Sequence, residues 1–166
     1  RLSSVGFEAD HVSVAAHAEW TSKAKSVAFA PHSGLVEGLR QVKDPEEVHS
    51  IRRAVHLAER GFAALQSTWL PEMTERQAAH DLEHAMRRFG ALRAAFEPIL
   101  GVGPQSALPH YRAGEQRLKE SPFVLIDWGA VESGGYHSDL TRVVAVSKIP
   151  PKLERLHRVV MRARQA

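Results

Sequence analysis

The chain has 166 residues, 43% of them hydrophobic, which is enough for one core with additional elements. Its 22 Lys and Arg residues against 19 Asp and Glu residues give a net charge of +3. No basic run is interleaved with aromatic residues, so nothing supports nucleic-acid binding. The lack of cysteine excludes disulfides, thiol nucleophiles and zinc-thiolate sites, and it fits a cytoplasmic location. We expect neither a membrane span nor a signal peptide, because no apolar run has the required length or pattern.

The first part of the chain, residues 1–38, has a mixed α/β pattern. Residues 2–7 have the composition of a strand and residues 11–28 that of a helix, and Leu35 and Val36 form a short apolar pair. We therefore expect a small α/β segment before the first long helix.

Two amphipathic helices are predicted next. In the first, Asp44 can cap the amino end, Pro45 suits the first helical position, and Glu47 completes a pattern like a capping box. Its expected buried face recurs every three or four positions and consists of Val48, Ile51, Val55, Ala58, Phe62 and Leu65. The second helix begins at Thr74, with Gln77 three residues later. Its expected buried residues are Leu82, Ala85, Met86 and Phe89.

The second half of the chain has the pattern of strands followed by one more helix. Residues 96–100 are predicted to form a strand. Segments 123–126 and 140–146 are rich in strand formers, and the glycine-containing segment 132–135 between them predicts a hairpin turn. An apolar stripe at helical spacing predicts a helix over 150–166, and because no helix stop follows it we expect a truncated sequence. This order of elements predicts an α+β fold.

Two aspartates lie on the two strands of this hairpin. Antiparallel pairing brings Asp127 and Asp139 opposite or nearly opposite each other. Two carboxylates held so close repel unless they share a cation or a proton. An aspartate beside a glycine-rich turn is often only a turn or surface residue. Asp127, however, follows four apolar residues, and a buried carboxylate without a partner is costly. These residues alone leave a metal site and a surface role both open.

The segments Asp127–Ala130 and Gly135–Arg142 together resemble the motif of the pita-bread metallopeptidases, and the aminopeptidase P and prolidase branch is the most similar. In that family the first Asp binds one of two metal ions and the second bridges both. By motif position these residues are Asp127 and Asp139. The spacing between them is one residue longer than is usual in the family. The additional residue falls in Ser133–Gly135, where it can lengthen the turn without shifting the strand register.

A second segment, Gly103–Tyr111, also resembles the family, in which a glycine, a loop of small residues and a Pro-His pair precede the first metal-binding Asp. The family's histidine lines the active site near the scissile carbonyl and the leaving group and is not a metal ligand. By position this residue is His110. Without the resemblance, one of ten histidines on a loop would be interpreted as a solvent-exposed side chain.

The resemblance implies the first half of a pita-bread (creatinase/aminopeptidase-like) fold, preceded by the tail of an N-terminal α/β domain. Residues 1–38 would then end the N-terminal domain, and residues 39–166 would form the N-terminal half of the catalytic domain. The family's remaining metal ligands, one His and two Glu, would come from the second half. Glu154 and His157 do not fit these roles, because they lie on the last helix and are expected at the surface.

The resemblance also implies an activity. The expected cofactors are two divalent metal ions, with Mn²⁺ favoured over Co²⁺, Fe²⁺ or Zn²⁺. The expected reaction is release of an N-terminal residue before proline, as by an Xaa-Pro aminopeptidase, or cleavage of Xaa-Pro dipeptides. The expected partner is therefore a peptide with proline at its second position, and a homo-oligomer is expected for the whole protein. Since ligands are missing from this chain, we expect the 166-residue chain alone to be inactive.

Two other classes of function stay open at this point. One is a non-catalytic relative with the pita-bread fold, acting as a binding or chaperone module. Such relatives often lose metal ligands, whereas this chain keeps Asp127 and Asp139. The other is an unrelated α+β binding domain whose hairpin matches by coincidence. A His and two Glu at strand ends in the sequence that follows would discriminate between catalysis and binding.

Overall fold

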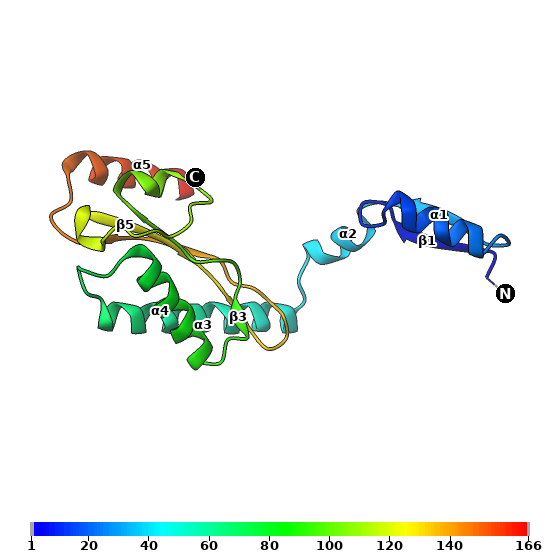
Figure 1. Cartoon of the computed structure of the whole chain (residues 1–166), viewed down its shortest axis with the longest axis horizontal. Helices are drawn as coiled ribbons and strands as arrows, with labels where there is room; N and C mark the ends of the chain where they lie inside the picture. Colours follow the sequence, from blue (N-terminus) through cyan, green and yellow to red (C-terminus); the bar gives the residue numbers. More distant parts are fainter. Residues whose placement is uncertain (1, 166) are drawn as a thin grey trace. The chain divides into compact units, whose positions relative to one another are not determined.

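The computed structural model describes residues 2–165, and the chain divides between Asp44 and Pro45 into two compact units (Figure 1). The first unit consists of two parallel strands, a helix that joins them and a helix that follows: β1 (Ser4–Glu8), α1 (Val14–Lys23), β2 (Ala28–His32) and α2 (Leu35–Gln41). Helix α2 belongs to the first unit, and the expected end of the N-terminal domain at residue 38 stays a prediction.

The helix predicted over residues 11–28 is confirmed only over α1. It begins after Ser13, whose hydroxyl oxygen accepts a hydrogen bond from the N–H of Ala16 at 3.2 Å. The end of the predicted range is wrong, because Ala28 begins strand β2 and pairs with β1. This pairing depends on residues more than twenty positions apart, so composition alone does not reveal it.

The second unit contains two long helices, a set of short strands, two 3₁₀ helices and a final helix. Its elements are α3 (Pro45–Thr68), α4 (Glu75–Arg88), β3 (Arg93–Ala94), β4 (Ile99–Val102), η1 (Gly103–Ala107), η2 (Leu118–Glu120), β5 (Phe123–Trp128), β6 (Ala130–Val131), β7 (Leu140–Ala145) and α5 (Pro151–Gln165).

The sheet of the second unit has the strand order β4-β5-β7, and both of its pairings are antiparallel. The short strands β3 and β6 form a separate antiparallel pair. Helices α3 and α4 pack on one face of the three-stranded sheet, and α5 lies over the other face (Figure 1). This arrangement confirms the predicted α+β fold. Among residues 2–165, no helix is long and apolar enough to cross a membrane.

The two long helices begin where the sequence predicts. Helix α3 starts at Pro45, and α4 starts after Thr74, which forms a complete capping box with Gln77. The buried stripe of α3 consists of Ala54, Ala58, Gly61 and Leu65, which confirms the prediction for Ala58 and Leu65 only. Small residues occupy most of this stripe because Met86 of α4 approaches Gly61, while Trp128 and Ser138 of the strands approach Ala58 and Ala54. The larger predicted residues Val48, Ile51, Val55 and Phe62 lie at its margins, half-buried or exposed.

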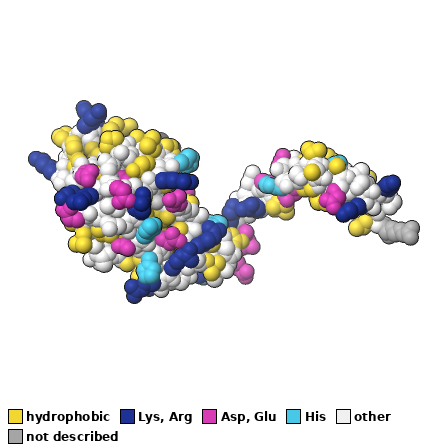
Figure 2. Space-filling view, viewed as in Figure 1, with side chains coloured by type: hydrophobic (Ala, Val, Ile, Leu, Met, Phe, Trp, Pro, Cys, Tyr) yellow, Lys and Arg dark blue, Asp and Glu magenta, His cyan; other side chains and the backbone are white. Residues whose placement is uncertain are grey.

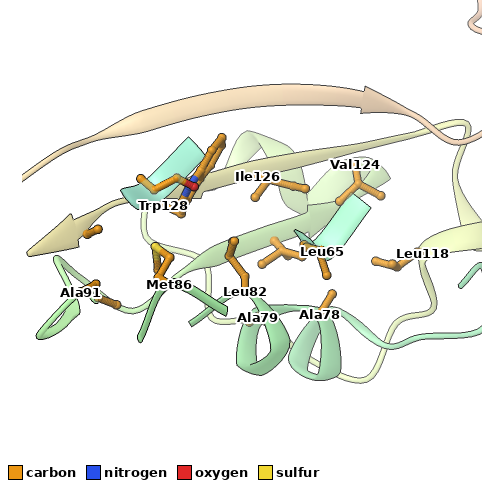
Figure 3. Close-up of a cluster of buried hydrophobic side chains, with 14 of the residues drawn as sticks. Leu65, Ala78, Ala79, Leu82, Met86, Ala91, Leu118, Val124, Ile126 and Trp128 are labelled. Carbon is orange, nitrogen blue, oxygen red and sulfur yellow. The ribbon is translucent and has the colours of Figure 1, made fainter. Parts of the chain in front are cut away.

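The core of the second unit lies between the sheet and the two long helices. Alternate residues of β5, namely Val124, Ile126 and Trp128, point toward Leu82 and Met86 of α4 (Figure 3). All five side chains are at most 1% exposed. The intervening residues of β5 lie on the opposite face of the sheet and are only half-buried. The run of four apolar residues before the first aspartate is therefore not a strand buried on both faces.

The strand predicted over residues 96–100 lies further along the chain, as β4. Proline has no N–H to donate to a strand ladder, so regular pairing begins after Pro98. The predicted hairpin is confirmed. Its register is unbroken, from β5 and β7 at the base to the pair of Val131 and His137 near the tip. The turn ends at Gly135, whose φ of 87° is a conformation that glycine adopts readily.

Candidate functional site

The three residues predicted from the sequence line one cleft of about 470 Å³ in the second unit. Asp127 comes from β5, Asp139 immediately precedes β7, and His110 lies on the loop after η1. Asp127 is half-buried, and Asp139 and His110 are exposed. The remaining lining residues are Phe96, Glu97, Ile99, Pro109, Tyr111 and Arg112. The structure therefore brings together the three predicted residues, which are up to 29 positions apart in the sequence.

Asp127 faces the cleft because its neighbour is anchored on the opposite face of the strand. The indole N–H of Trp128 donates to the carbonyl of Ala58 in α3 at 2.9 Å. The Trp128 ring also stacks on Phe62 at a centroid distance of 4.7 Å. Successive side chains of a strand point to opposite faces, so this anchor directs Asp127 away from the core.

Asp139 also faces the cleft, because its neighbour Ser138 is anchored on the opposite face of the hairpin. Ser138 is 4% exposed, and its hydroxyl donates to the carbonyl of Ala54 in α3 at 3.0 Å. The backbone of Ser138 also lies very close to Gly129, where an added Cβ would meet the Ser138 carbonyl oxygen at 1.8 Å. Only glycine fits at position 129, and the two halves of the hairpin therefore approach closely beside both aspartates.

The two aspartates are diagonal neighbours on one face of the hairpin. The residue that pairs directly with Asp127 is Thr141, two positions after Asp139. Diagonal neighbours in an antiparallel pair have their backbones about 7–8 Å apart, within reach of converging side chains. The hydroxyl of Thr141 donates to Oδ1 of Asp127 at 2.7 Å and orients this carboxylate. The predicted placement, opposite or nearly opposite, corresponds to this diagonal arrangement.

The loop that carries His110 is held by a residue that sequence reasoning missed. Glu75 is fully buried at the start of α4 and accepts a hydrogen bond from the hydroxyl of Tyr111 at 2.8 Å. Burial, together with this bond and the negative charge of Glu75, raises the pKa of Tyr111 to about 12. Tyr111 therefore stays a neutral hydrogen-bond donor throughout the physiological pH range. No local sequence signal marks Glu75, because a glutamate in the first turn of a helix is commonly exposed.

A second buried carboxylate, Glu132, fixes the hairpin tip against α3. It is 1% exposed, and its Oε2 accepts from Arg53 Nη2 at 3.1 Å while its Oε1 accepts from the N–H of Tyr136 at 3.2 Å. A hydrogen bond from the N–H of Gly134 lowers the pKa of Glu132. The bonds from Tyr136 and Arg53 lower this pKa further, and together they outweigh the opposing effect of burial.

Acid is expected to destabilise the second unit through Glu132. Its folded pKa lies below the unfolded value, so its contribution to stability is complete above the unfolded pKa and is lost as the pH falls through the folded pKa. We expect Glu132→Gln to lower the free energy of unfolding at pH 7 by about 1–3 kcal/mol. The variant should also show a smaller loss of Tm than the wild type below about pH 4.

Thermal melts followed by circular dichroism between pH 7 and pH 3 test this expectation. Glu59→Gln, an exposed change on the same helix that Arg53 occupies, is the control and should follow the wild-type curve. Parallel curves for Glu132→Gln and the wild type would show that Glu132 does not contribute to the pH dependence.

The cleft residues do not complete a metal site by themselves. Within residues 2–165, three side chains close enough to ligate a common ion occur only at Glu8, His11 and Glu37. That group is exposed and belongs to the first unit, where His11 Nε2 and Glu37 Oε1 lie 3.7 Å apart on the surface. Among the described residues, His110 and the two aspartates share a cleft but do not form such a cluster.

Comparison with known proteins decides the family. Residues 49–166 match the sequence model of Metallopeptidase family M24. The chain belongs to this family. Membership of M24 supports a peptidase that depends on divalent metal ions, and it confirms the pita-bread resemblance and the predicted fold.

Three relatives show how far the M24 similarity extends. The uncharacterized peptidase YqhT of Bacillus subtilis is 30% identical over 162 residues, which are 98% of this chain and 46% of the relative. The Xaa-Pro dipeptidase of Bacillus anthracis superposes with a TM-score of 0.85 at 34% identity, covering 95% of this chain and 44% of that protein. The X-Pro aminopeptidase of Thermotoga maritima has a TM-score of 0.89 at 30% identity, with coverage of 98% and 46%. The chain thus spans less than half the length of these relatives.

Proposed function

We propose that the whole protein is an Xaa-Pro peptidase, which releases the residue before a proline or cleaves Xaa-Pro dipeptides. The observation that carries this proposal is the convergence of His110, Asp127 and Asp139 in one cleft of an M24 chain. Relatives of similar sequence and fold include an Xaa-Pro dipeptidase and an X-Pro aminopeptidase, which supports this substrate class. The cleft is also lined by Phe96, Ile99 and Pro109, apolar side chains that suit a peptide substrate.

The donor set of the cleft fits divalent metal ions. Asp127 and Asp139 offer hard carboxylate oxygens on one face of the hairpin, and Thr141 orients one of these carboxylates, as residues around metal ligands commonly do. We propose that these aspartates hold part of a two-metal centre, with Mn²⁺ as the favoured ion. One His and two Glu from outside this chain would complete it. When bound, such ions lower the pKa of a water molecule and polarise the scissile carbonyl.

The proposed role of His110 is to contact the substrate rather than the metal. His110 lies on a loop that forms one wall of the cleft, and both aspartates lie on the β5–β7 hairpin that forms another wall. An imidazole in this place can donate a hydrogen bond to the scissile carbonyl or to the leaving proline nitrogen. The aspartates on one side of the cleft would then bind the metal ions, and His110 on the other side would orient the peptide.

The full-length protein provides the test of this function. Purified protein is treated with a chelator, and the hydrolysis of an Xaa-Pro dipeptide, an Xaa-Pro tripeptide and an Xaa-Ala dipeptide is measured before and after addition of Mn²⁺. We expect turnover of Xaa-Pro peptides that is lost on chelation and restored by Mn²⁺. The ratio of dipeptide to tripeptide turnover assigns the dipeptidase or aminopeptidase type. Chelator-resistant activity, or no preference for proline, would exclude the proposal, and a lack of turnover with every metal would favour a binding role.

A further inference from the structure

One buried carboxylate contacts three points of the segment that carries His110. Glu75, in the first turn of α4, has no exposed surface. Its Oε1 accepts a hydrogen bond from the N–H of Val102 at 2.8 Å. Its Oε2 accepts one from the hydroxyl of Tyr111 at 2.8 Å and one from the N–H of Gly114 at 2.9 Å. A buried carboxylate with three donors is bound more rigidly than one with a single exposed partner.

The three donors lie at separate points along the loop that carries His110. Val102 is the last residue of β4, so it marks where the segment leaves the sheet. Gly114 lies four residues after His110, where the segment returns to α4, and Tyr111 is the direct neighbour of His110. A single side chain therefore holds the start, the middle and the end of one loop.

The amino end of α4 strengthens the same attachment. The N–H of Glu75 donates to the carbonyl of Gln116 at 2.9 Å, and the N–H of Arg76 donates to the carbonyl of Gly114 at 3.0 Å. These are first-turn amides, which have no partner within their own helix. The returning part of the loop is thus fixed to α4 by backbone as well as by side chain, and α4 is itself part of the packed core.

We propose that Glu75 is a positioning residue for His110, which it places in the cleft through Tyr111 and the two ends of the loop. The importance of this placement for catalysis rests on the proposed function. The placement itself is a property of this chain and can be measured without metal or substrate. A carboxylate that served only the stability of the fold would affect the whole second unit and would not act selectively on the loop.

A pair of tyrosines provides a matched test. Tyr111 and Tyr136 are both half-buried, and each donates its hydroxyl to a glutamate at 2.8 Å. The partner of Tyr136 is Glu47 in α3, outside the His110 loop. Tyr111→Phe and Tyr136→Phe therefore remove the same chemical group and the same kind of bond, and only the first change touches the loop.

Amide hydrogen exchange followed by NMR on the full-length protein without metal measures the positioning directly. In Tyr111→Phe, we expect protection of the amides of Leu108, Tyr111 and Gly114 to fall about tenfold or more, because one bond to a charged group is lost. Protection of Val124 in the core should not change. Tyr136→Phe should leave all four amides as in the wild type. Equal protection of the loop in both variants, or an equal loss throughout the core, would overturn the proposal.

Kinetics of the full-length Mn²⁺-loaded protein test the consequence for His110. We expect Tyr111→Phe to lower kcat for an Xaa-Pro dipeptide about tenfold and Glu75→Gln about 100-fold, since small displacements of an orienting group reduce the rate strongly. KM should stay within about twofold, metal content should be unchanged, and Tyr136→Phe should match the wild type. Loss of loop protection without a fall in kcat would overturn the positioning role in catalysis. If the wild-type protein has no turnover, the proposed function fails, and the exchange data still decide the placement.

Discussion

Replacing His110 by alanine in the full-length protein is expected to lower kcat on an Xaa-Pro peptide by roughly 10²–10⁴-fold. The reason is its place in the cleft, on the loop wall that faces the two aspartates. Bound Mn²⁺ should stay near the wild-type level, because His110 does not form a ligand cluster with the aspartates among residues 2–165. Steady-state kinetics together with elemental analysis of the purified protein measure both quantities.

Two further variants make the His110 result specific. His84→Ala changes an exposed histidine on α4 and should leave both kcat and metal content unchanged. Asp139→Asn should have the opposite signature to His110→Ala, with loss of metal and activity together, because the amide is a much weaker ligand than the carboxylate. Loss of metal in His110→Ala would make this residue a ligand and would contradict its assigned role.

Elements with strong local signals were predicted well from the sequence. The start of α4 follows from Thr74 and Gln77, which satisfy each other's backbone N–H groups in the structure. The hairpin follows from two strand-forming runs around a glycine-rich turn, and Gly135 there has the positive φ that the turn requires. In both cases the deciding interactions join residues only a few positions apart, so the sequence pattern contains them.

Features that depend on long-range packing could not be predicted in this way. The buried stripe of α3 contains Gly61 because Met86 of α4 packs directly against it, and it contains Ala54 where Ser138 of the hairpin approaches, whereas hydrophobic periodicity favours larger residues. The side chain of Glu75 contacts residues 27 to 39 positions away, and nothing beside it in the sequence indicates that it is buried. Asp127 was predicted at the end of a buried strand, but β5 is buried on one face only, and Asp127 lies on its other, half-buried face, which lines the cleft.

Helix α5 and the outer face of the sheet both expose apolar side chains. Val143 of β7 is 48% exposed, and Leu156 and Val160 of α5 are 52% and 64% exposed. Hydrophobic side chains gather over α5 on the upper side of the second unit (Figure 2). A groove of about 690 Å³ between β7 and α5 has a mainly apolar lining. An apolar surface of this kind favours association with a further protein surface.

The 166-residue chain alone is therefore expected to show no Xaa-Pro turnover, even at saturating Mn²⁺. Asp127 and Asp139 supply only part of the proposed ligand set, and Glu154 and His157, the acid and histidine on α5, line the apolar groove and not the cleft of the two aspartates. Mn²⁺ should bind weakly and raise Tm little, since a ligand stabilises a fold only in proportion to its occupancy. The uncovered apolar face should make the chain dimerise or aggregate.

The decisive comparison assays the chain and the full-length protein side by side on one Xaa-Pro dipeptide with increasing Mn²⁺. Calorimetry gives the affinity for Mn²⁺, and light scattering gives the state of association. The full-length protein, which would contribute the remaining ligands and cover the apolar face, should bind Mn²⁺ tightly, gain several degrees in Tm and turn over substrate. Asp139→Asn in the full-length protein should weaken Mn²⁺ binding and abolish turnover, as in the chain alone, without causing association. Metal-dependent turnover by the 166-residue chain would show that its own residues complete the site, and the assignment of a shared ligand set would then be wrong.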